Sequence, residues 1–386
     1  MNQSLPPMTP SFATRLIRWQ RQHGRHDLPW QNTRDPYRVW LAEIMLQQTQ
    51  AATVAPYYRR FLERFATLPA LAAAAVEEVM SLWSGLGYYA RARNLHAAAR
   101  RVMREHGGVF PQTPETIARL PGVGRSTANA IAVVCFGARE PILDGNVKRV
   151  FCRVFGIEGV PGTAALESRL WRHGAELLPT RDVATYIQAQ MDLGATVCTR
   201  AKPQCARCPL GDVCIARRDD RIAELPWKKP RRALPERAVT LLVLRDAQGR
   251  VLLERRPASG IWGGLLSFPE LPELPELLGP LAATSDSEEA RVAAYLRRTF
   301  GVAVPPAPTF FLAPFVHVFT HFRLRITPLV CMLDTPPQAM ESRWQWLPAE
   351  DWHDAALPTP VRRILETLAS TETTTVVTAA AVATRR

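Results

Sequence analysis

The chain has 386 residues, of which 47% are hydrophobic, and a formal net charge of +13. This length predicts two to three domains, each with its own core. No run of about twenty apolar residues occurs, and the N-terminus lacks the basic start and apolar core of a signal peptide. We therefore expect a cytoplasmic protein without a membrane partner, acting as a monomer.

The positive charge is concentrated in the first 225 residues, which carry 29 Lys and Arg against 19 Asp and Glu. The remaining residues carry 19 against 16. A basic domain of this kind is typical of nucleic-acid-binding proteins. Charge alone fits a merely solvated basic surface equally well.

The periodicity of apolar residues divides the chain into two kinds of structure. Residues 11–216 follow an almost wholly helical pattern, with residues 1–10 expected to be frayed. The charged, Pro-rich stretch 217–236 predicts an extended linker. We then expect a β-hairpin around Gln248-Gly249, strands over 322–333 and 343–348, and helices over 285–300 and 359–370. The fold class is therefore multidomain: an all-α domain over 11–216, a smaller α+β domain over 237–369 and a disordered tail over 370–386.

A glycine-containing turn lies within residues 115–137, where 120–137 read LPGVGRSTANAIAVVCFG. We expect a short helix to end at Leu120 and a new helix to begin at Ser126 or Thr127. Gly122 and Gly124 permit positive φ and close approach of another molecule, and the N–H groups of a helix N-terminus suit a phosphate oxygen. This predicts a helix–hairpin–helix that holds the DNA backbone without reading its sequence. The alternative is an ordinary helix–turn–helix inside a core.

Four cysteines lie within the loop 198–214 with the spacing C-x6-C-x2-C-x5-C: Cys198, Cys205, Cys208 and Cys214. Thiolates gathered this closely are typical of a metal site. Zinc sites usually contain two C-x-x-C pairs, whereas one pair flanked by single cysteines favours an iron–sulfur cluster. Zinc and four unrelated core cysteines are the alternatives.

Two carboxylates stand out in otherwise apolar segments. Asp35-Pro36 predicts the start of a helix that carries Glu43 among apolar residues. Asp144 follows the apolar approach Pro141-Ile142-Leu143 and precedes Gly145. Desolvation should raise the pKa of Glu43. Asp144 could be a simple helix cap, and Glu43 could lie at the exposed edge of its helix.

Taken together, the turn, Asp144 and the cysteine loop resemble the helix–hairpin–helix superfamily of DNA glycosylases. EIMLQQTQ, GLGYYARARNL, LPGVGRST and LDGNVKRV resemble the adenine DNA glycosylase (MutY) family in particular. The resemblance runs from Leu28 to the end of the second domain. There, RPASGIWGGLLSFPE resembles the Nudix fold, but Arg297, Arg298 and Thr299 stand where Nudix hydrolases place carboxylates for magnesium. The resemblance therefore implies a recognition module without hydrolase activity.

The resemblance also implies an activity and its residues. The expected enzyme is a monofunctional DNA glycosylase that removes adenine mispaired with 8-oxoguanine, or with guanine, from double-stranded DNA. It would carry one [4Fe-4S] cluster on the four cysteines. Glu43 would be the general acid, Asp144 would stabilise the cationic sugar, and Asn146 would orient Asp144. Ser126 replaces the lysine with which strand-cutting members form a Schiff base.

Further positions are expected, by resemblance, to contact DNA or the extruded base. Gln48 and Tyr88 would insert into the duplex, bordered by Leu46 and Thr49. Leu28, Trp30 and Gln188 would line the adenine pocket. Phe319, Thr320 and His321 would sense 8-oxoguanine, with Thr320 in place of the family's serine.

Three other functions compete with this interpretation. An endonuclease III-like glycosylase that cuts the strand is opposed by Ser126 and by the second domain. A non-catalytic iron–sulfur DNA-binding protein is opposed by the presence of both Glu43 and Asp144. A Nudix hydrolase with a DNA-targeting domain is opposed by the missing carboxylates.

Overall fold

The computed structural model describes residues 11–228, 233–257, 259–272, 288–300, 309–333 and 343–370. The expected frayed N-terminus, the tail beyond residue 370 and part of the expected linker lie outside these ranges. The chain forms two compact units, one of residues 1–74 and 94–231, the other of residues 75–93 and 232–386. Across the ranges that the structure describes, no helix has the length and apolar character needed to cross a membrane.

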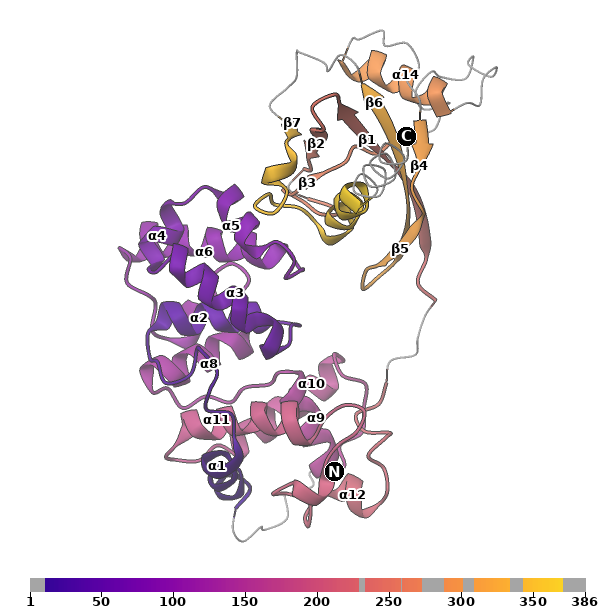
Figure 1. Ribbon diagram of the computed structural model, residues 1–386. Coiled ribbons are helices and arrows are strands. Elements are labelled where there is room, and N and C mark those ends of the chain that lie inside the picture. Colours follow the sequence, from indigo (N-terminus) through magenta and orange to yellow (C-terminus); the bar gives the residue numbers. More distant parts are fainter. Residues whose placement is uncertain are drawn as a thin grey trace, which may run out of the picture. The chain divides into compact units, whose positions relative to one another are not determined.

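The first unit is built from helices (Figure 1). Its elements are α1 Phe12–His23, α2 Pro36–Leu46, α3 Ala51–Arg64, α4 Leu68–Ala73, α6 Ala90–His106 (shared with the second unit), α7 Pro114–Ile117, α8 Arg125–Phe136, α9 Gly145–Val154, α10 Ala164–Glu176, α11 Val183–Asp192, the π-helix η1 Leu193–Val197, the 3-10 helix η2 Cys205–Arg207 and α12 Ile215–Arg218.

The start and end of α2 follow from its sequence. Asp35 caps the helix, since its carboxylate accepts a hydrogen bond of 2.9 Å from the Tyr37 N–H, and Pro36 has the φ angle that a first helical residue needs. Beyond its C-terminus, the Gln47 amide donates to the Gly122 carbonyl at 3.3 Å. The helix packs against α3 and α8, so Glu43 is carried on a well-anchored element.

A second part of this unit is an apolar core to which α1, α8, α9 and α11 contribute. Phe12 meets the rings of Phe151 and Tyr186 edge-on, with centroids 6.0 and 6.3 Å apart. Each such buried side chain stabilises the fold by about 1.5–3 kcal/mol. Cys208 and Cys214 pack against the same core, which fixes the cysteine loop to α9.

Over the residues that the structure describes, the second unit contains a mixed sheet of seven strands. Its elements are α5 Val76–Trp83, β1 Glu236–Asp246, β2 Val251–Arg255, β3 Leu266–Ser267, α14 Glu288–Phe300, β4 Thr309–Phe311, β5 Phe315–Val318, β6 Arg323–Leu333, β7 Trp344–Leu347, the 3-10 helix η3 Ala349–Asp351 and a helix over 359–370.

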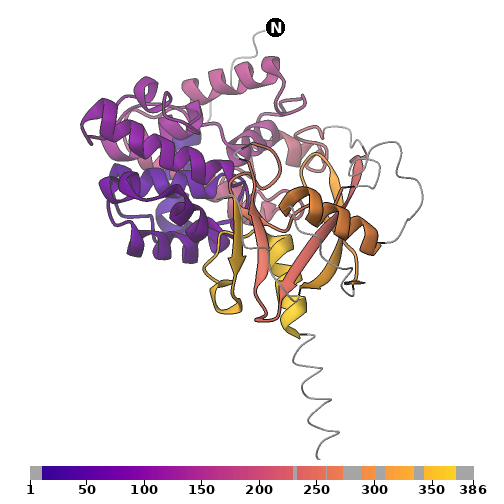
Figure 2. The ribbon, with the colours of Figure 1, turned by 90° about the horizontal axis from the view of Figure 1, so that it is seen from above.

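The strands run in the order β3-β2-β1-β6-β4, with β5 paired to β6 and β7 to β2. β1 and β6 are parallel, with Glu236 opposite Arg323 and Asp246 opposite Leu333, and the other pairs are antiparallel. Figures 1 and 2 show the sheet between α14 and the helix over 359–370. Leu242, Leu329 and Leu296 belong to the core shared by the sheet and α14.

The structure confirms the predicted fold class, with a helical domain followed by a smaller domain that combines helices with a sheet. The hairpin of β1 and β2 forms as predicted, with Arg245 opposite Val251 and Gly249 at φ +78°. The strands predicted over 322–333 and 343–348 appear as β6 and β7, and the predicted helices appear as α14 and the helix over 359–370.

The predicted helix–hairpin–helix forms, with three differences. α7 ends at Ile117 and not at Leu120, and α8 begins at Arg125, one residue before Ser126. Only one of the two glycines has positive φ: Gly122 lies at +76°, whereas Gly124, the N-cap of α8, lies at −89°. No side chain caps α8, which is compatible with a phosphate oxygen accepting from the first N–H groups of this helix.

The two glycines should respond differently to alanine. A Cβ on Gly122 would lie 2.8 Å from the Asn94 Cβ at a strained φ, whereas a Cβ on Gly124 meets nothing within 4 Å. We expect Gly122→Ala to destabilise the fold by about 1–3 kcal/mol and Gly124→Ala by less than about 1 kcal/mol. Urea unfolding of both variants measures the difference, and equal losses would contradict the assignment of the turn.

Candidate functional site

A cleft of about 1030 Å³ lies in the first unit. Segments from α2, the turn after it, α8, the start of α9 and η1 form its wall. Seven of the residues singled out in the sequence line it: Glu43, Leu46, Gln48, Thr49, Ser126, Asp144 and Asn146. Side chains from positions more than a hundred residues apart thus meet in one place.

Glu43 projects from α2 into this cleft and is partly exposed there. Its neighbours Ala42 and Ile44 are buried. Burial raises the pKa of Glu43 to about 7, and the negative charge of Asp144 contributes further in the same direction. Glu43 therefore holds a proton at neutral pH in a substantial fraction of molecules, which an exposed glutamate does not.

Asp144 is both the helix cap and a lining residue of the cleft. One carboxylate oxygen accepts a 2.8 Å hydrogen bond from the Val147 N–H at the start of α9. The other accepts a 3.0 Å hydrogen bond from the Asn146 side-chain amide. The helix cap is therefore confirmed, and the same hydrogen bonds fix the direction of the carboxylate in the cleft. The catalytic role of Asp144 stays a prediction.

Arg149 holds Asn146 in place and was not singled out in the sequence. Its guanidinium donates to Asn146 Oδ1 at 2.8 Å, to the Gly194 carbonyl at 2.7 Å and to the Cys198 carbonyl at 2.8 Å. Gly194 must be a glycine here, since a Cβ would lie 2.4 Å from the Asn146 Cβ. Asn146 and Arg149 are three residues apart, so they lie on the same face of a helix. This spacing is the feature of the sequence from which a contact between them could have been predicted.

Ser126 also has a partner within the site. Its hydroxyl accepts a 3.0 Å hydrogen bond from the Leu143 N–H. This bond ties the start of α8 to the segment that delivers Asp144. Ser126 is thus at once part of the helix–hairpin–helix and a support for the residue before the carboxylate.

Leu28, Trp30 and Gln188 are not among the residues that line this cleft. The Leu28 N–H bonds to the Gln31 side chain at 3.1 Å, and the Trp30 ring meets the Tyr58 ring edge-on at 5.6 Å. The Gln188 amide donates to Asp192 at 2.9 Å. The role of these three residues in an adenine pocket stays a prediction.

Gln48 and Tyr88 share an unusual backbone conformation. Gln48 has φ +59° and Tyr88 has φ +50°, in the left-handed region that costs a non-glycine residue about 1–3 kcal/mol. Both side chains are exposed. Strain of this kind concentrates at functional positions. Gln48 lies in the first unit and Tyr88 in the second.

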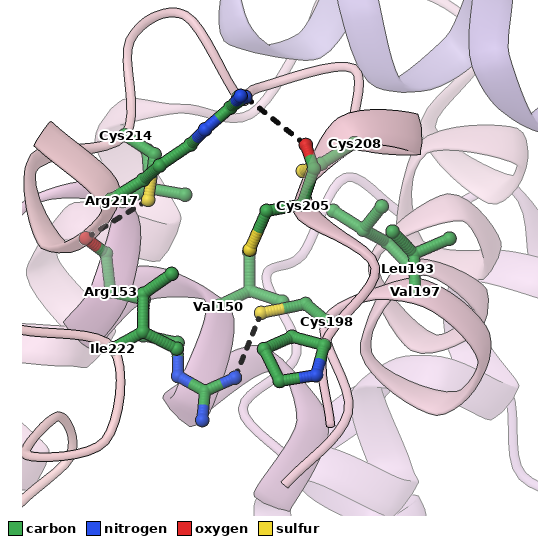
Figure 3. Close-up of a pocket in the computed structure, with 13 residues that line it drawn as sticks. Val150, Arg153, Leu193, Val197, Cys198, Cys205, Cys208, Cys214, Arg217 and Ile222 are labelled. Atoms are coloured by element: carbon green, nitrogen blue, oxygen red, sulfur yellow. Dashed lines mark hydrogen bonds between the residues drawn. The ribbon is translucent and has the colours of Figure 1, made fainter. Parts of the chain in front are cut away.

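The four cysteines line one cavity together with Val150, Leu193, Val197 and Ile222 (Figure 3). All four thiols are unpaired by disulfides. The Arg153 guanidinium donates to Cys198 Sγ at 3.4 Å, and Arg217 donates to the Cys205 carbonyl at 3.1 Å. Within the ranges that the structure describes, no three His, Cys, Asp or Glu side chains converge on one point as a single metal ion requires.

Phe319, Thr320 and His321 form the turn between β5 and β6. The Phe319 N–H donates to the Phe322 carbonyl at 2.9 Å, and the Phe319 and Phe322 rings stack with centroids 4.5 Å apart. Thr320 Oγ1 lies 3.4 Å from His321 Nδ1. Thr320 and His321 are exposed at the tip, so both can reach a partner outside the protein.

Comparison with known proteins gives two family matches that follow one another along the chain. Residues 41–176 match the family described as HhH-GPD superfamily base excision DNA repair protein, and residues 240–367 match the NUDIX domain. A solved structure of a thermostable thymine-DNA glycosylase is similar over 54% of this chain and 95% of that chain, with 28% identity and a TM-score of 0.49.

Two relatives match nearly the whole chain. The adenine DNA glycosylase of Buchnera aphidicola (subspecies Acyrthosiphon pisum) is 32% identical over 92% of this chain and 97% of its own length. The human adenine DNA glycosylase is 34% identical over 92% of this chain and 73% of its own length. Because this likeness runs through the glycosylase domain and the Nudix domain alike, the chain is a DNA glycosylase that belongs to the adenine DNA glycosylase family.

Proposed function

We propose that this enzyme excises adenine paired with 8-oxoguanine, and less well with guanine, from double-stranded DNA without cutting the strand. The observation that carries the proposal is the pairing of Glu43 and Asp144 in one cleft, with the pKa of Glu43 raised to about 7. A proton donor and a negative charge in separate environments are what cleavage of a glycosidic bond requires.

The proposed chemistry uses both carboxylates in turn. Protonated Glu43 transfers its proton to a ring nitrogen of adenine, so that the bond between base and sugar breaks and neutral adenine leaves. The Asp144 carboxylate stabilises the positive charge left on the sugar. A water molecule then attacks the sugar carbon from which adenine has left. The water gives a proton to the Glu43 carboxylate, which restores the acid.

Asn146 and Arg149 act as positioning residues in this scheme. The Asn146 amide holds one oxygen of Asp144, and the Val147 N–H holds the other. The Arg149 guanidinium in turn donates to Asn146 Oδ1 at 2.8 Å, which fixes the orientation of the Asn146 side chain. A preorganised carboxylate stabilises developing charge without having to reorient during the reaction.

The absence of a lysine at position 126 supports hydrolysis without strand cutting. A serine hydroxyl cannot form a Schiff base with the sugar. The nearby Lys148 amine forms an ion pair of 2.7 Å with Glu167, which leaves it poorly placed as a nucleophile.

Several features support DNA as the substrate. Arg25, Arg149 and Arg200 line the cleft and supply positive charge, and the uncapped start of α8 suits a phosphate. Access to the base requires extrusion from the duplex, for which Gln48 and Tyr88 would insert between bases. Leu46 and Thr49 would border the opening, and Leu28, Trp30 and Gln188 would contact the extruded adenine.

The second domain would recognise the opposite base. Thr320 and His321 are exposed on the turn between β5 and β6 beside the partly buried Phe319, and the Thr320 hydroxyl keeps the hydrogen-bonding group of the family's serine. Arg297 and Arg298 occupy the last turn of α14, where carboxylates would be needed to hold magnesium. We therefore propose that this domain has no hydrolase activity. We further propose that the enzyme acts as a monomer on the DNA of a bacterial nucleoid.

We propose that the cysteine cavity holds one [4Fe-4S] cluster. Its donor set is four thiols, one for each iron, surrounded by apolar side chains and by the Arg153 donor to Cys198. Thiols that surround a cavity instead of meeting at one point favour a cluster over a single zinc ion. When bound, the cluster would hold the loop 198–214 in shape, and Cys198, Cys205, Cys208 and Cys214 would be its ligands.

Single-turnover cleavage of a duplex with one 8-oxoguanine:adenine pair tests the activity. We expect adenine release, with strand breakage only after alkali, and loss of release in Glu43→Gln by at least about a hundredfold. The Glu63→Gln variant, on the exposed face of α3, serves as the matched control. Breakage without alkali would contradict the role given to Ser126, and full activity in Glu43→Gln would contradict the mechanism.

Chemical analysis tests the cluster independently of activity. The purified protein should contain about four irons and four sulfides per chain and show the broad visible absorption of sulfur-to-iron charge transfer. Cys205→Ser should lose iron and absorption, whereas Cys331→Ser, at a buried cysteine of the second unit, should keep both. Zinc in place of iron, or an unchanged iron content in Cys205→Ser, would refute the assignment.

A further inference from the structure

The turn between α5 and α6 is strained and must be held in place by its surroundings. Gly85, Gly87 and Tyr88 have φ angles of +93°, +75° and +50°. The two glycines adopt such angles readily, but Tyr88 does so only at a cost of about 1–3 kcal/mol. Its ring is nevertheless 45% exposed, so burial of the ring is not what maintains the conformation.

Part of the support comes from inside the turn. The guanidinium of Arg91 lies over the rings of Trp83 and Tyr88, 5.4 Å from each centroid. It also donates to the Gly87 carbonyl at 3.2 Å, and the Trp83 indole N–H donates to the same oxygen at 3.2 Å. These contacts hold the middle of the turn. At its first residue, the Ser84 N–H donates to the Ser81 carbonyl at 2.9 Å, and the Ser84 hydroxyl makes further hydrogen bonds.

Ser84 is fixed by the C-terminal part of the second unit. Its buried hydroxyl donates to the Leu357 carbonyl at 2.6 Å and accepts from Arg362 at 3.1 Å. Arg362 also donates to the carbonyls of Trp352, at 3.2 Å, and Ala355, at 2.8 Å. The N–H donors of a planar guanidinium have fixed relative directions. The bonds to these carbonyls therefore determine the position from which Arg362 donates to Ser84.

The other end of the turn leads to the proposed 8-oxoguanine sensor. Arg93 donates to the Gly263 carbonyl at 2.5 Å. The preceding residue, Trp262, is buried and itself has φ +55°. Its ring lies 6.1 Å from that of Phe319. A continuous set of contacts therefore joins the Tyr88 turn to the turn that carries Thr320 and His321.

We propose that Ser84 and Arg362 are positioning residues for mispair discrimination. Through this pair, the Nudix-like domain fixes the position of the turn that carries Tyr88, which would insert into the duplex. The position is fixed relative to the turn that carries Thr320 and His321, which would contact the opposite base. If the hydrogen bond between Ser84 and Arg362 is lost, insertion of Tyr88 should no longer depend on which base the second domain has bound. This inference rests on the proposed function, since it concerns preference between two substrates of the same site.

Single-turnover rates on 8-oxoguanine:adenine and guanine:adenine duplexes test the pair. We expect Ser84→Ala to slow excision opposite 8-oxoguanine about tenfold and excision opposite guanine about twofold, so that the preference falls about fivefold. Arg362→Met should also lower the preference, and the combined loss in the double variant should be smaller than the product of the two single losses, because both single changes remove the bond between Ser84 and Arg362.

Ser267→Ala is the matched control. Ser267 is a buried serine of the same unit whose hydroxyl bonds to the Phe268 carbonyl at 3.1 Å. Its loss should leave the preference unchanged, with a melting temperature similar to that of Ser84→Ala. A merely structural role of Ser84 would slow both substrates equally.

The outcomes separate the two proposals. An unchanged preference in Ser84→Ala, or additive effects in the double variant, would overturn the role of the pair while leaving the proposed function intact. A wild-type enzyme that releases no adenine opposite 8-oxoguanine would overturn the proposed function itself.

Discussion

Two carboxyl groups that share a cleft repel each other when both are ionised, and the first unit is arranged around this constraint. Glu43 comes from the middle of α2, where burial opposes its charge. Asp144 comes from the N-terminus of α9, where the Val147 N–H and the Asn146 amide donate hydrogen bonds to its carboxylate. Burial thus favours the protonated form of Glu43, while the hydrogen bonds to Asp144 fix the direction of its carboxylate.

The wall behind Asp144 is shared with the cysteine loop. Arg149 bonds to Asn146, to Gly194 and to Cys198, so three segments meet on one guanidinium. Gly194 allows η1 to approach α9 closely enough for this arrangement. The loop 198–214 therefore contributes to the geometry of the cleft although the cysteines themselves do not line it.

Local signals in the sequence sufficed to predict several elements of the fold. Asp35-Pro36 marks the start of α2, the hairpin residues Gln248-Gly249 mark the turn between β1 and β2, and the cysteine spacing marks the loop. The supports of the site could not be predicted in this way. Ser126 bonds to a residue 17 positions away, which no local pattern encodes.

The same limit applies to the division into units. Residues 75–93 read as part of a continuous helical pattern, yet they group with the second unit. Arg362 and Ser84 lie 278 residues apart in the chain. A hydrogen bond between groups so distant in the chain depends on how the second unit folds. It produces no periodic pattern that could be recognised in the sequence.

The most direct test of the account is the titration of Glu43 itself. In protein carrying ¹³C-labelled glutamate carboxyls, the signal lost in Glu43→Gln identifies the residue by NMR. We predict a pKa near 7 in the wild type and a lower pKa in Asp144→Asn, because the neighbouring negative charge is removed. Excision should then slow as the pH rises through that value, since the acid loses its proton. A Glu43 pKa at the ordinary glutamate value of about 4.3, or one that Asp144→Asn leaves unchanged, would contradict the account.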